Sequence, residues 1–330
     1  MTKPAILIAR AIFPEVLEQL SRHFAVESNQ DDVIWSAEEL AQHLQGKVGV
    51  FMTGSERVNA DLLARCPQLK LCANMSVGYN NFDLPAMTAA GVLGTNAPDV
   101  LTETTADFGF ALLLATARRV TESEHFLRAG KWTRWSYELF AGAEVHGTTL
   151  GIVGMGRIGQ AIARRAALGF GMQVIYHNRS RLDAATEGSF NARYVGKEEL
   201  LKTADHVMLV LPYSASSHHA IGAAELALMK PTATLINLAR GGIVDDFALA
   251  QALRDKRIAA AGLDVFEGEP AVNPALLSVP NVVLTPHIAS ATLGTRRAMA
   301  ALAVDNLIGF LLQGKAVTPL NPEALNRPGA

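Results

Sequence analysis

The sequence contains little cysteine and no excess of charge of either sign. Cys66 and Cys72 are its two cysteines, too few for a disulfide framework and spaced unlike any zinc-binding pattern. We interpret both as buried thiols. The 29 basic and 31 acidic residues give a formal net charge of −2. Because no basic excess is available to neutralise phosphates, we expect no nucleic-acid partner.

Long hydrophobic runs are also absent. The longest, from Phe108 to Ala117, is well short of the roughly 18 residues that a membrane-spanning helix needs. The N-terminal residues lack the apolar stretch and small-residue cleavage site of a signal peptide. With 330 residues, 49% of them hydrophobic and 18% charged, the chain is long enough for two globular domains. We therefore expect a soluble, cytoplasmic protein with no membrane partner.

Short β-branched runs alternate with helical patterns, which predicts parallel sheets covered by helices. Ser36 and Glu39 form a capping box at the start of one such helix. One long helix is expected from Leu101 to about Arg128, and a last one over about 293–313, which returns to the first domain. The expected strands are 5–10, 48–53, 69–76, 92–96, 149–155, 173–178, 192–196, 206–212, 233–239, 260–266 and 281–286.

This order predicts an α/β fold with two Rossmann-like domains. A doubly wound parallel-sheet cofactor domain, residues 99–287, is expected to be inserted into a smaller, flavodoxin-like substrate-binding domain. The smaller domain comprises residues 1–98 and 288–330. The first boundary between the two domains falls in the segment NAPDV, because a proline disfavours helical geometry in the residue before it.

A glycine fingerprint, GIVGMGRIGQAIARR, places Gly154, Gly156 and Gly159 after an apolar strand and at the start of a helix. The first glycine permits a tight turn, the second lets the backbone approach a pyrophosphate, and the third allows close packing of helix on strand. The helix N-terminus adds free N–H groups and a positive dipole end. The pattern predicts dinucleotide binding; the alternative is a glycine turn that is only structural.

The residues after the next strand bear on the choice of nucleotide. An NAD-binding fold usually has an acidic residue about 20 positions beyond the fingerprint, where it binds the ribose hydroxyls. Here that place is taken by His177, followed by Asn178, Arg179 and Ser180. Arg179 could form charge-assisted bonds to a 2′-phosphate. The segment therefore favours NADP(H), although a solvated loop in an NAD-binding protein remains the alternative.

Three later segments combine an arginine, carboxylates and a histidine at the ends of expected strands, where ligands bind in open α/β sheets. They are NLARGGIVD with Arg240, LDVFEGEP with Asp264 and Glu269, and TPHIASAT with His287. Arginine can bind a carboxylate bidentately, and histidine can transfer a proton near neutral pH. Taken singly, each residue could instead be an ion-pair partner, a solvated loop residue or a core histidine.

The fingerprint and these three segments, in this order, resemble the D-isomer-specific 2-hydroxyacid dehydrogenase family. The resemblance is strongest to its glyoxylate/hydroxypyruvate reductase and 2-ketogluconate reductase branch. It implies that Arg240 binds and polarises an oxo acid, that Glu269 pairs with His287, and that His287 is the general acid in reduction. Asp264 would hold the nicotinamide carboxamide.

The resemblance also implies substrate contacts by the backbone of Val77 and Gly78, in NMSVGYNNFD, and by Ser290. The segment at about 120–147 corresponds to an arm through which the cofactor domains form a homodimer. Within it, Trp135 would wall the substrate pocket of the partner, or else lie only in the interface. The expected cofactor contacts are Thr105, Gly154, Gly156, Arg157, Ile158, Gly159, Asn178, Arg179, Ser180, Pro212, Ala239 and Asp264.

The expected activity is therefore NADPH-dependent reduction of a small 2-oxo acid to the D-2-hydroxy acid. Glyoxylate, hydroxypyruvate and 2-ketogluconate are the candidate substrates. An NAD-dependent enzyme of other substrate range is one alternative, and a nucleotide-sensing protein like the corepressors that share this architecture is another. No metal is expected, and we interpret the His218–His219 pair as surface or packing residues.

Overall fold

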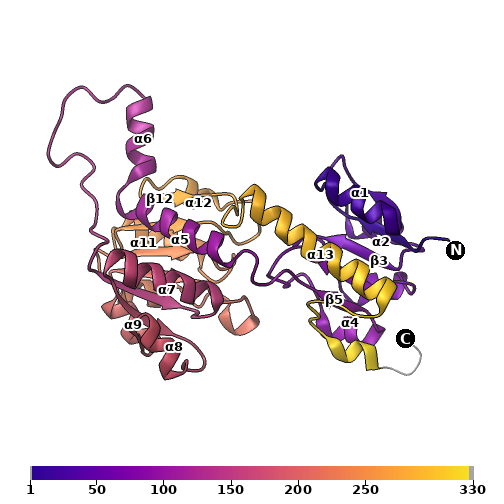
Figure 1. The fold of residues 1–330 in the computed structure, drawn as a ribbon. Helices are drawn as coiled ribbons and strands as arrows, with labels where there is room; N and C mark the ends of the chain where they lie inside the picture. The colour runs from indigo at the N-terminus through magenta and orange to yellow at the C-terminus, as the bar shows by residue number, and fades with distance from the viewer. Residues whose placement is uncertain (1, 327–330) are drawn as a thin grey trace. The chain divides into compact units, whose positions relative to one another are not determined.

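The computed structural model describes residues 2–326, which form two compact units (Figure 1). The first unit runs to Leu101 and resumes at Ala291, and the second is Thr102–Ser290. Both boundaries between the units lie a few residues beyond the predicted domain boundaries, which fall after residues 98 and 287. One reason is that the backbone N–H groups of Ile288 and Ala289 donate to Asp264 of the second unit, at 2.8 and 2.9 Å. The roles assigned to the two units as domains stay predictions.

The first unit contains a five-stranded parallel sheet in the order β2-β1-β3-β4-β5. This is the strand order of flavodoxin-like folds. The strands are β1 Ala5–Ile8, β2 Ala25–Ser28, β3 Gly49–Met52, β4 Leu71–Asn74 and β5 Leu93–Thr95. The helices are α1 Pro14–His23, α2 Ala37–His43, α3 Ala60–Arg65, α4 Leu84–Ala90 and α13 Leu293–Gln313, with a 3₁₀ turn at Pro322–Asn326.

Sequence patterns identified most of these elements. The capping box of Ser36 and Glu39 is present at α2, and α13 has the predicted bounds and packs on β3, β4 and α1. The edge strand β2 was not predicted, because its sequence, AVES, is short and without an apolar run. Cys66 and Cys72 are buried free thiols, as expected.

The second unit contains a seven-stranded parallel sheet in the order β12-β11-β10-β9-β6-β7-β8. Read from β8, this is the doubly wound order of a dinucleotide-binding fold, with one further strand at the end. The strands are β6 Thr149–Val153, β7 Gln173–His177, β8 Ala192–Tyr194, β9 His206–Leu209, β10 Thr234–Asn237, β11 Ala260–Leu263 and β12 Val282–Leu284. The helices are α5 Thr102–Ala117, α6 Val120–Arg128, α7 Arg157–Phe170, α8 Ala184–Ser189, α9 Lys197–Thr203, α10 Ala223–Leu228, α11 Asp246–Arg254 and α12 Pro274–Leu277, with a 3₁₀ turn at Ala215–Ser217.

Helices cover both faces of this second sheet. Side chains alternate along a strand, so neighbours on β6 enter different cores. Ile152 belongs to the core that contains side chains of α5 and α7, and Val153 belongs to the core that contains side chains of α9, α10 and α11. Burial on both faces explains why these strands are continuous apolar runs. The predicted fold class, two α/β units with parallel sheets, is confirmed.

The single helix predicted from Leu101 to about Arg128 is wrong, because the chain turns between α5 and α6. Arg119 adopts a left-handed backbone conformation with φ of 53°. The carbonyl of Ala117 accepts a hydrogen bond from the N–H of Ala143 at 2.9 Å. A Cβ on Gly142 would lie 2.2 Å from the same carbonyl oxygen, so the returning chain needs glycine at this position. The tertiary contact therefore ends α5.

No helix among the described residues is long and apolar enough to cross a membrane. This agrees with the short apolar runs of the sequence.

Candidate active site

The glycine fingerprint forms a tight turn between β6 and α7. Gly154 has a φ of 101°, and a Cβ there would lie 2.6 Å from the backbone nitrogen of Leu211. A Cβ on Gly159 would lie 2.4 Å from the carbonyl oxygen of Gly154. Both glycines are thus required by close backbone approach. At Gly156, by contrast, a Cβ would meet nothing within 4 Å, so its surface is open to a ligand.

The open surface at Gly156 fits a dinucleotide pyrophosphate. Gly156 is the N-cap of α7, a helix of 14 residues, and has no side chain that could cap its first turn. The side-chain oxygen of Asn178 accepts a bond from the N–H of Met155 at 2.7 Å and so fixes the loop. These residues could hold the phosphates of a nicotinamide dinucleotide through backbone N–H groups and the helix dipole.

The segment after β7 presents a basic side chain and no carboxylate to solvent. Asn178 is held from both sides, because its carbonyl also accepts a bond from the hydroxyl of Tyr194 at 3.1 Å. Nδ1 of His177 lies 3.0 Å from the carbonyl of Val195. Arg179 and Ser180 are exposed. The segment could therefore bind the 2′-phosphate of NADP(H). It offers no acidic side chain for the ribose hydroxyls of NAD(H).

Arg240 follows β10 in a turn organised by Asn237. The Asn237 side chain accepts a bond from the N–H of Ala239 at 3.0 Å and donates to the carbonyl of Arg240 at 3.3 Å. A Cβ on Gly241 would lie 1.7 Å from the carbonyl oxygen of Phe266, so glycine permits the turn to touch the loop after β11. Asn237 was not among the predicted site residues, and its place before LARGG was the available signal.

The guanidinium of Arg240 is partly buried. Burial lowers its pKa, and the negative charge of Glu269 opposes that effect. An arginine remains charged under such a shift. One nitrogen, Nη1, donates to the carbonyl of Ala239 at 2.7 Å, which leaves the other donors of the planar group for a carboxylate or a carbonyl oxygen.

The predicted pair of Glu269 and His287 is present. Oε2 of Glu269 lies 2.8 Å from Nδ1 of His287, and Oε1 accepts a bond from the N–H of Phe266 at 2.8 Å. Burial raises the pKa of Glu269, but the bonds from His287 and Phe266 outweigh it, so the net shift is downward. The carboxylate is therefore ionised at neutral pH.

His287 combines backbone strain with exposure. Its φ is 53°, a left-handed conformation that is uncommon for a non-glycine residue and that concentrates at functional sites. Its side chain is 49% exposed. Because Nδ1 is engaged by Glu269, Nε2 is the ring nitrogen available to a ligand.

Asp264 lies at the end of β11, where its buried carboxylate fastens the segment that carries His287. It accepts bonds from the hydroxyl of Thr285 at 2.7 Å and from the N–H groups of Ile288 and Ala289. Burial raises the pKa of Asp264, and these bonds oppose the rise. The structure thus gives Asp264 a positioning role that the sequence did not predict. Its contact with a nicotinamide carboxamide stays a prediction.

The predicted substrate loop lies in the first unit, between β4 and α4. The carbonyl of Val77 accepts a bond from Asn96 at 2.8 Å, and that of Gly78 accepts from Asn74 and Ser76 at 3.0 Å each. With both carbonyls engaged by side chains of the same unit, the N–H groups are the backbone atoms available to an anion. Their role in substrate binding stays a prediction.

The remaining predicted contacts lie on the second unit. Thr105 is buried in α5, and Ala239 is buried after β10. Ile158 and Ser290 are partly buried, and Arg157 is exposed at the start of α7. The carbonyl of Pro212, after β9, accepts a bond from Ser217 at 3.2 Å. The cofactor and substrate contacts assigned to these residues stay predictions.

A large cavity lies at the opposite edge of the second sheet. It measures about 850 Å³ and is lined by His206, Thr234 and Ala260, the first residues of β9, β10 and β11, together with Arg119 and Glu144. Arg240, Glu269 and His287 follow the carboxyl ends of strands instead. Because ligands of open α/β sheets bind at the carboxyl ends, we do not assign the active site to this cavity.

Comparison with known proteins identifies the family of the chain. Residues 110–289 match the NAD-binding domain of the D-isomer specific 2-hydroxyacid dehydrogenases. The chain is 46% identical over 333 residues to a glyoxylate reductase of Thermococcus onnurineus, covering 99% of each protein. It is 46% identical over 326 residues to glyoxylate/hydroxypyruvate reductase B of Klebsiella pneumoniae, covering 97% of this chain and 99% of that protein.

A solved structure of a glyoxylate/hydroxypyruvate reductase is also similar to this chain. The NADPH-dependent glyoxylate/hydroxypyruvate reductase of Sinorhizobium meliloti, determined in complex with NADP and malonate, superposes with a TM-score of 0.87 at 37% sequence identity, and all of both chains is covered. The chain belongs to the D-isomer-specific 2-hydroxyacid dehydrogenase family, in its glyoxylate/hydroxypyruvate reductase branch.

Proposed function

We propose that this protein catalyses the NADPH-dependent reduction of a small 2-oxo acid to the D-2-hydroxy acid. The observation that carries the proposal is the pair of Glu269 and His287, joined at 2.8 Å, on the same sheet edge as Arg240. Glyoxylate and hydroxypyruvate are the favoured substrates, because the named relatives reduce them; 2-ketogluconate is the third candidate. A bound nicotinamide cofactor would supply the hydride.

The three side chains have distinct tasks in this proposal. Arg240 binds the carboxylate and polarises the oxo group, which its planar fork can do with two donors at once. His287 donates the proton from Nε2 to the carbonyl oxygen as it gains electrons. Glu269 holds Nδ1 of His287, keeps the ring oriented and stabilises the imidazolium.

A substrate panel tests the proposed function. The three oxo acids are each assayed with NADPH and with NADH, and oxidation of the cofactor is followed by absorbance. We expect turnover with glyoxylate and hydroxypyruvate and a higher kcat/KM with NADPH. Turnover with NADH alone would favour the NAD-dependent alternative. Cofactor binding without turnover of any oxo acid would favour a nucleotide-sensing protein.

Replacing Glu269 with glutamine tests its role beside His287. The amide keeps the size of the side chain but removes the negative charge that stabilises the imidazolium. We expect the falling limb of the pH profile for reduction to move to lower pH, because the proton donor is lost earlier as pH rises. The measurement is kcat against pH for both proteins. Superimposable profiles would show that Glu269 has no influence on the proton donor.

Replacing Arg179 with alanine tests the preference for NADPH. If Arg179 binds the 2′-phosphate, we expect the Kd for NADPH to rise by about tenfold to a hundredfold, the effect of losing one charge-assisted bond. The Kd for NADH should change little. Arg193→Ala is the matched control, since Arg193 is an exposed arginine paired with Glu199 at 2.7 Å. Equal weakening of both cofactors would count against the assignment.

We further propose that the protein is a homodimer, formed through the arm at about 120–147, which comprises α6 and the segment that follows it. The segment between α6 and β6 contains no helix or strand (Figure 1). It presents large apolar side chains to solvent, among them Trp132 at 55% exposed, Trp135 at 75% and Tyr137 at 79%. Exposed apolar surface of this kind is typical of an interface.

The expected cytoplasmic location stays a prediction.

Within this arm, Trp135 is proposed to wall the substrate pocket of the partner subunit. Trp135→Ala should then change the ratio of kcat/KM between hydroxypyruvate and glyoxylate by about fivefold or more, since losing part of an apolar wall changes discrimination by ~1 kcal/mol or more. Trp132→Ala is the matched control and should leave the ratio unchanged. Light scattering first establishes that both variants remain dimers. An unchanged ratio in Trp135→Ala would assign this indole to the interface alone.

A further inference from the structure

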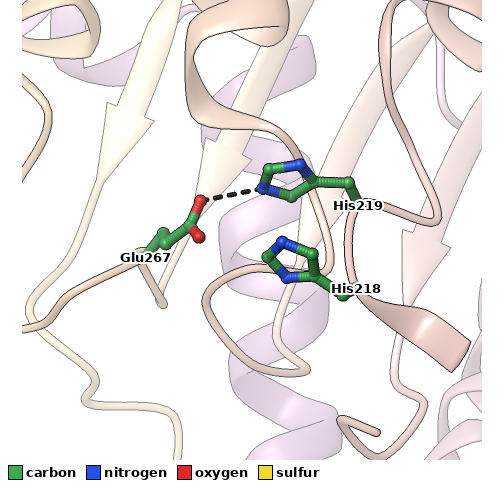
Figure 2. A group of neighbouring side chains, drawn as sticks. All are labelled: His218, His219 and Glu267. Carbon is green, nitrogen blue, oxygen red and sulfur yellow. Dashed lines mark hydrogen bonds and ion pairs between the residues drawn. The ribbon is translucent and has the colours of Figure 1, made fainter. Parts of the chain in front are cut away.

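Three exposed side chains of the second unit come together outside the catalytic pair. His218 and His219 follow the 3₁₀ turn after β9, and Glu267 lies in the loop after β11 (Figure 2). One ligand atom from each of the three lies within 4.8 Å of the others. Nε2 of His219 is 2.9 Å from Oε2 of Glu267. The sequence did not predict this cluster, because the fold brings together residues 48 positions apart.

Two imidazoles and one carboxylate form a donor set that suits a borderline divalent metal ion. Zn²⁺ binds histidine nitrogen and carboxylate oxygen, and three protein ligands with water in the remaining position are common. Hard cations such as Mg²⁺ prefer oxygen ligands and bind histidine poorly. The chemistry of the cluster therefore selects a zinc-like ion.

Each histidine has a further polar neighbour. Nδ1 of His218 lies 3.1 Å from the hydroxyl of Tyr213, and Nδ1 of His219 lies 4.0 Å from a carboxylate oxygen of Asp245. The hydrogen bond to Tyr213 is of the kind that fixes the ring of a metal-binding histidine and leaves its other nitrogen for the ion. Asp245 is too distant for a hydrogen bond and contributes its negative charge. His219 also has a φ of 49°, held by a 2.7 Å bond from its N–H to the carbonyl of Gly242.

The surroundings of the cluster are negatively charged. The N–H of Glu267 donates to the side chain of Asp246 at 3.4 Å, and Asp245 adjoins His219. A divalent cation at the cluster would be attracted by these carboxylates.

We propose that His218, His219 and Glu267 bind one divalent metal ion of the zinc class. The two rings are stacked, with centroids 3.9 Å apart, whereas a ring nitrogen binds metal in its own plane. One ring must therefore rotate on binding. The rotating ring would exchange contacts of the metal-free protein for the bond to the ion, and the exposure of the three side chains leaves room for this movement. The ion would tie the loop after β9 to the loop that carries Glu269.

The test is isothermal titration calorimetry of the full-length, untagged protein with ZnCl₂ after removal of metals by a chelator. We expect one Zn²⁺ per chain, with Mg²⁺ giving no heat of binding. His219→Ala and Glu267→Gln should each weaken zinc binding at least about tenfold, the loss typical of a metal-site partner. Glu269→Gln is the control, because His287 and Glu269 are a second histidine–carboxylate pair. It should bind zinc as the wild type does.

A second measurement uses the wild-type protein and therefore does not depend on how well the variants fold. Co²⁺ added to the wild-type protein should give visible absorption bands of nitrogen- and oxygen-bound cobalt, and Zn²⁺ should displace them. No zinc binding, equal binding by wild type and Glu267→Gln, or loss of binding in Glu269→Gln would each overturn the proposal. Neither readout depends on catalysis, so failure here leaves the proposed reductase activity untouched.

Discussion

His287→Ala is expected to lower kcat for oxo-acid reduction by on the order of 10²- to 10⁴-fold, the usual contribution of a positioned proton donor. The alanine removes Nε2, the ring nitrogen that is available to a ligand, since Nδ1 is held by Glu269 at 2.8 Å. Binding of NADPH should be almost unchanged, because the glycine turn and α7 lie at a different strand end. Steady-state kinetics and a fluorescence titration with NADPH measure the two quantities.

The control for this variant is His23→Ala, which removes an exposed histidine at the end of α1. It should keep both kcat and the Kd for NADPH. If His287→Ala retained more than about a tenth of the wild-type kcat, another group would have to donate the proton. If it lost NADPH binding as well, the substitution would have disturbed the fold of the cofactor site rather than proton transfer.

Arg240→Lys is expected to lower kcat/KM for the oxo acid by about a hundredfold or more, the scale of losing a charge-stabilising donor at a reacting oxygen. The charge is kept, so Coulomb attraction alone would predict a mild effect. A lysine ammonium, however, cannot give two parallel hydrogen bonds from one planar group. The bond from Arg240 to the carbonyl of Ala239 would be lost too.

Arg240→Ala provides the complementary measurement. Its activity should be restored in part by added guanidinium ion, which can occupy the space of the lost side chain, and should not be restored by ammonium. A mild effect of Arg240→Lys, or equal rescue by the two ions, would mean that Arg240 acts only through its charge. The assignment of bidentate substrate binding would then fail.

Much of the fold could be predicted because its signals are local. Apolar runs buried on both faces identify parallel strands, and Gly154, Gly156 and Gly159 each have the backbone environment that the fingerprint implies. The pair of Glu269 and His287 could be predicted only from the order of the motifs in a known family, since the two residues lie 18 positions apart in different loops.

The features that could not be predicted depend on tertiary contacts. The break at Arg119 arises because the returning chain at Ala143 takes the carbonyl of Ala117, and no residue in this stretch is a proline. The buried carboxylate of Asp264 holds Ala289, which depends on the pairing of β11 with β12. The positioning role of Asn237 likewise depends on a turn that only the folded loop shows.

The identity of the product tests the proposed D-specific, NADPH-dependent reduction. Wild-type protein is incubated with hydroxypyruvate and NADPH, and the glycerate formed is resolved by chiral chromatography while oxidation of NADPH is followed. We expect one D-glycerate for each NADPH oxidised, with no L-glycerate. Formation of L-glycerate, or no consumption of NADPH or NADH with any of the three oxo acids, would contradict this proposal.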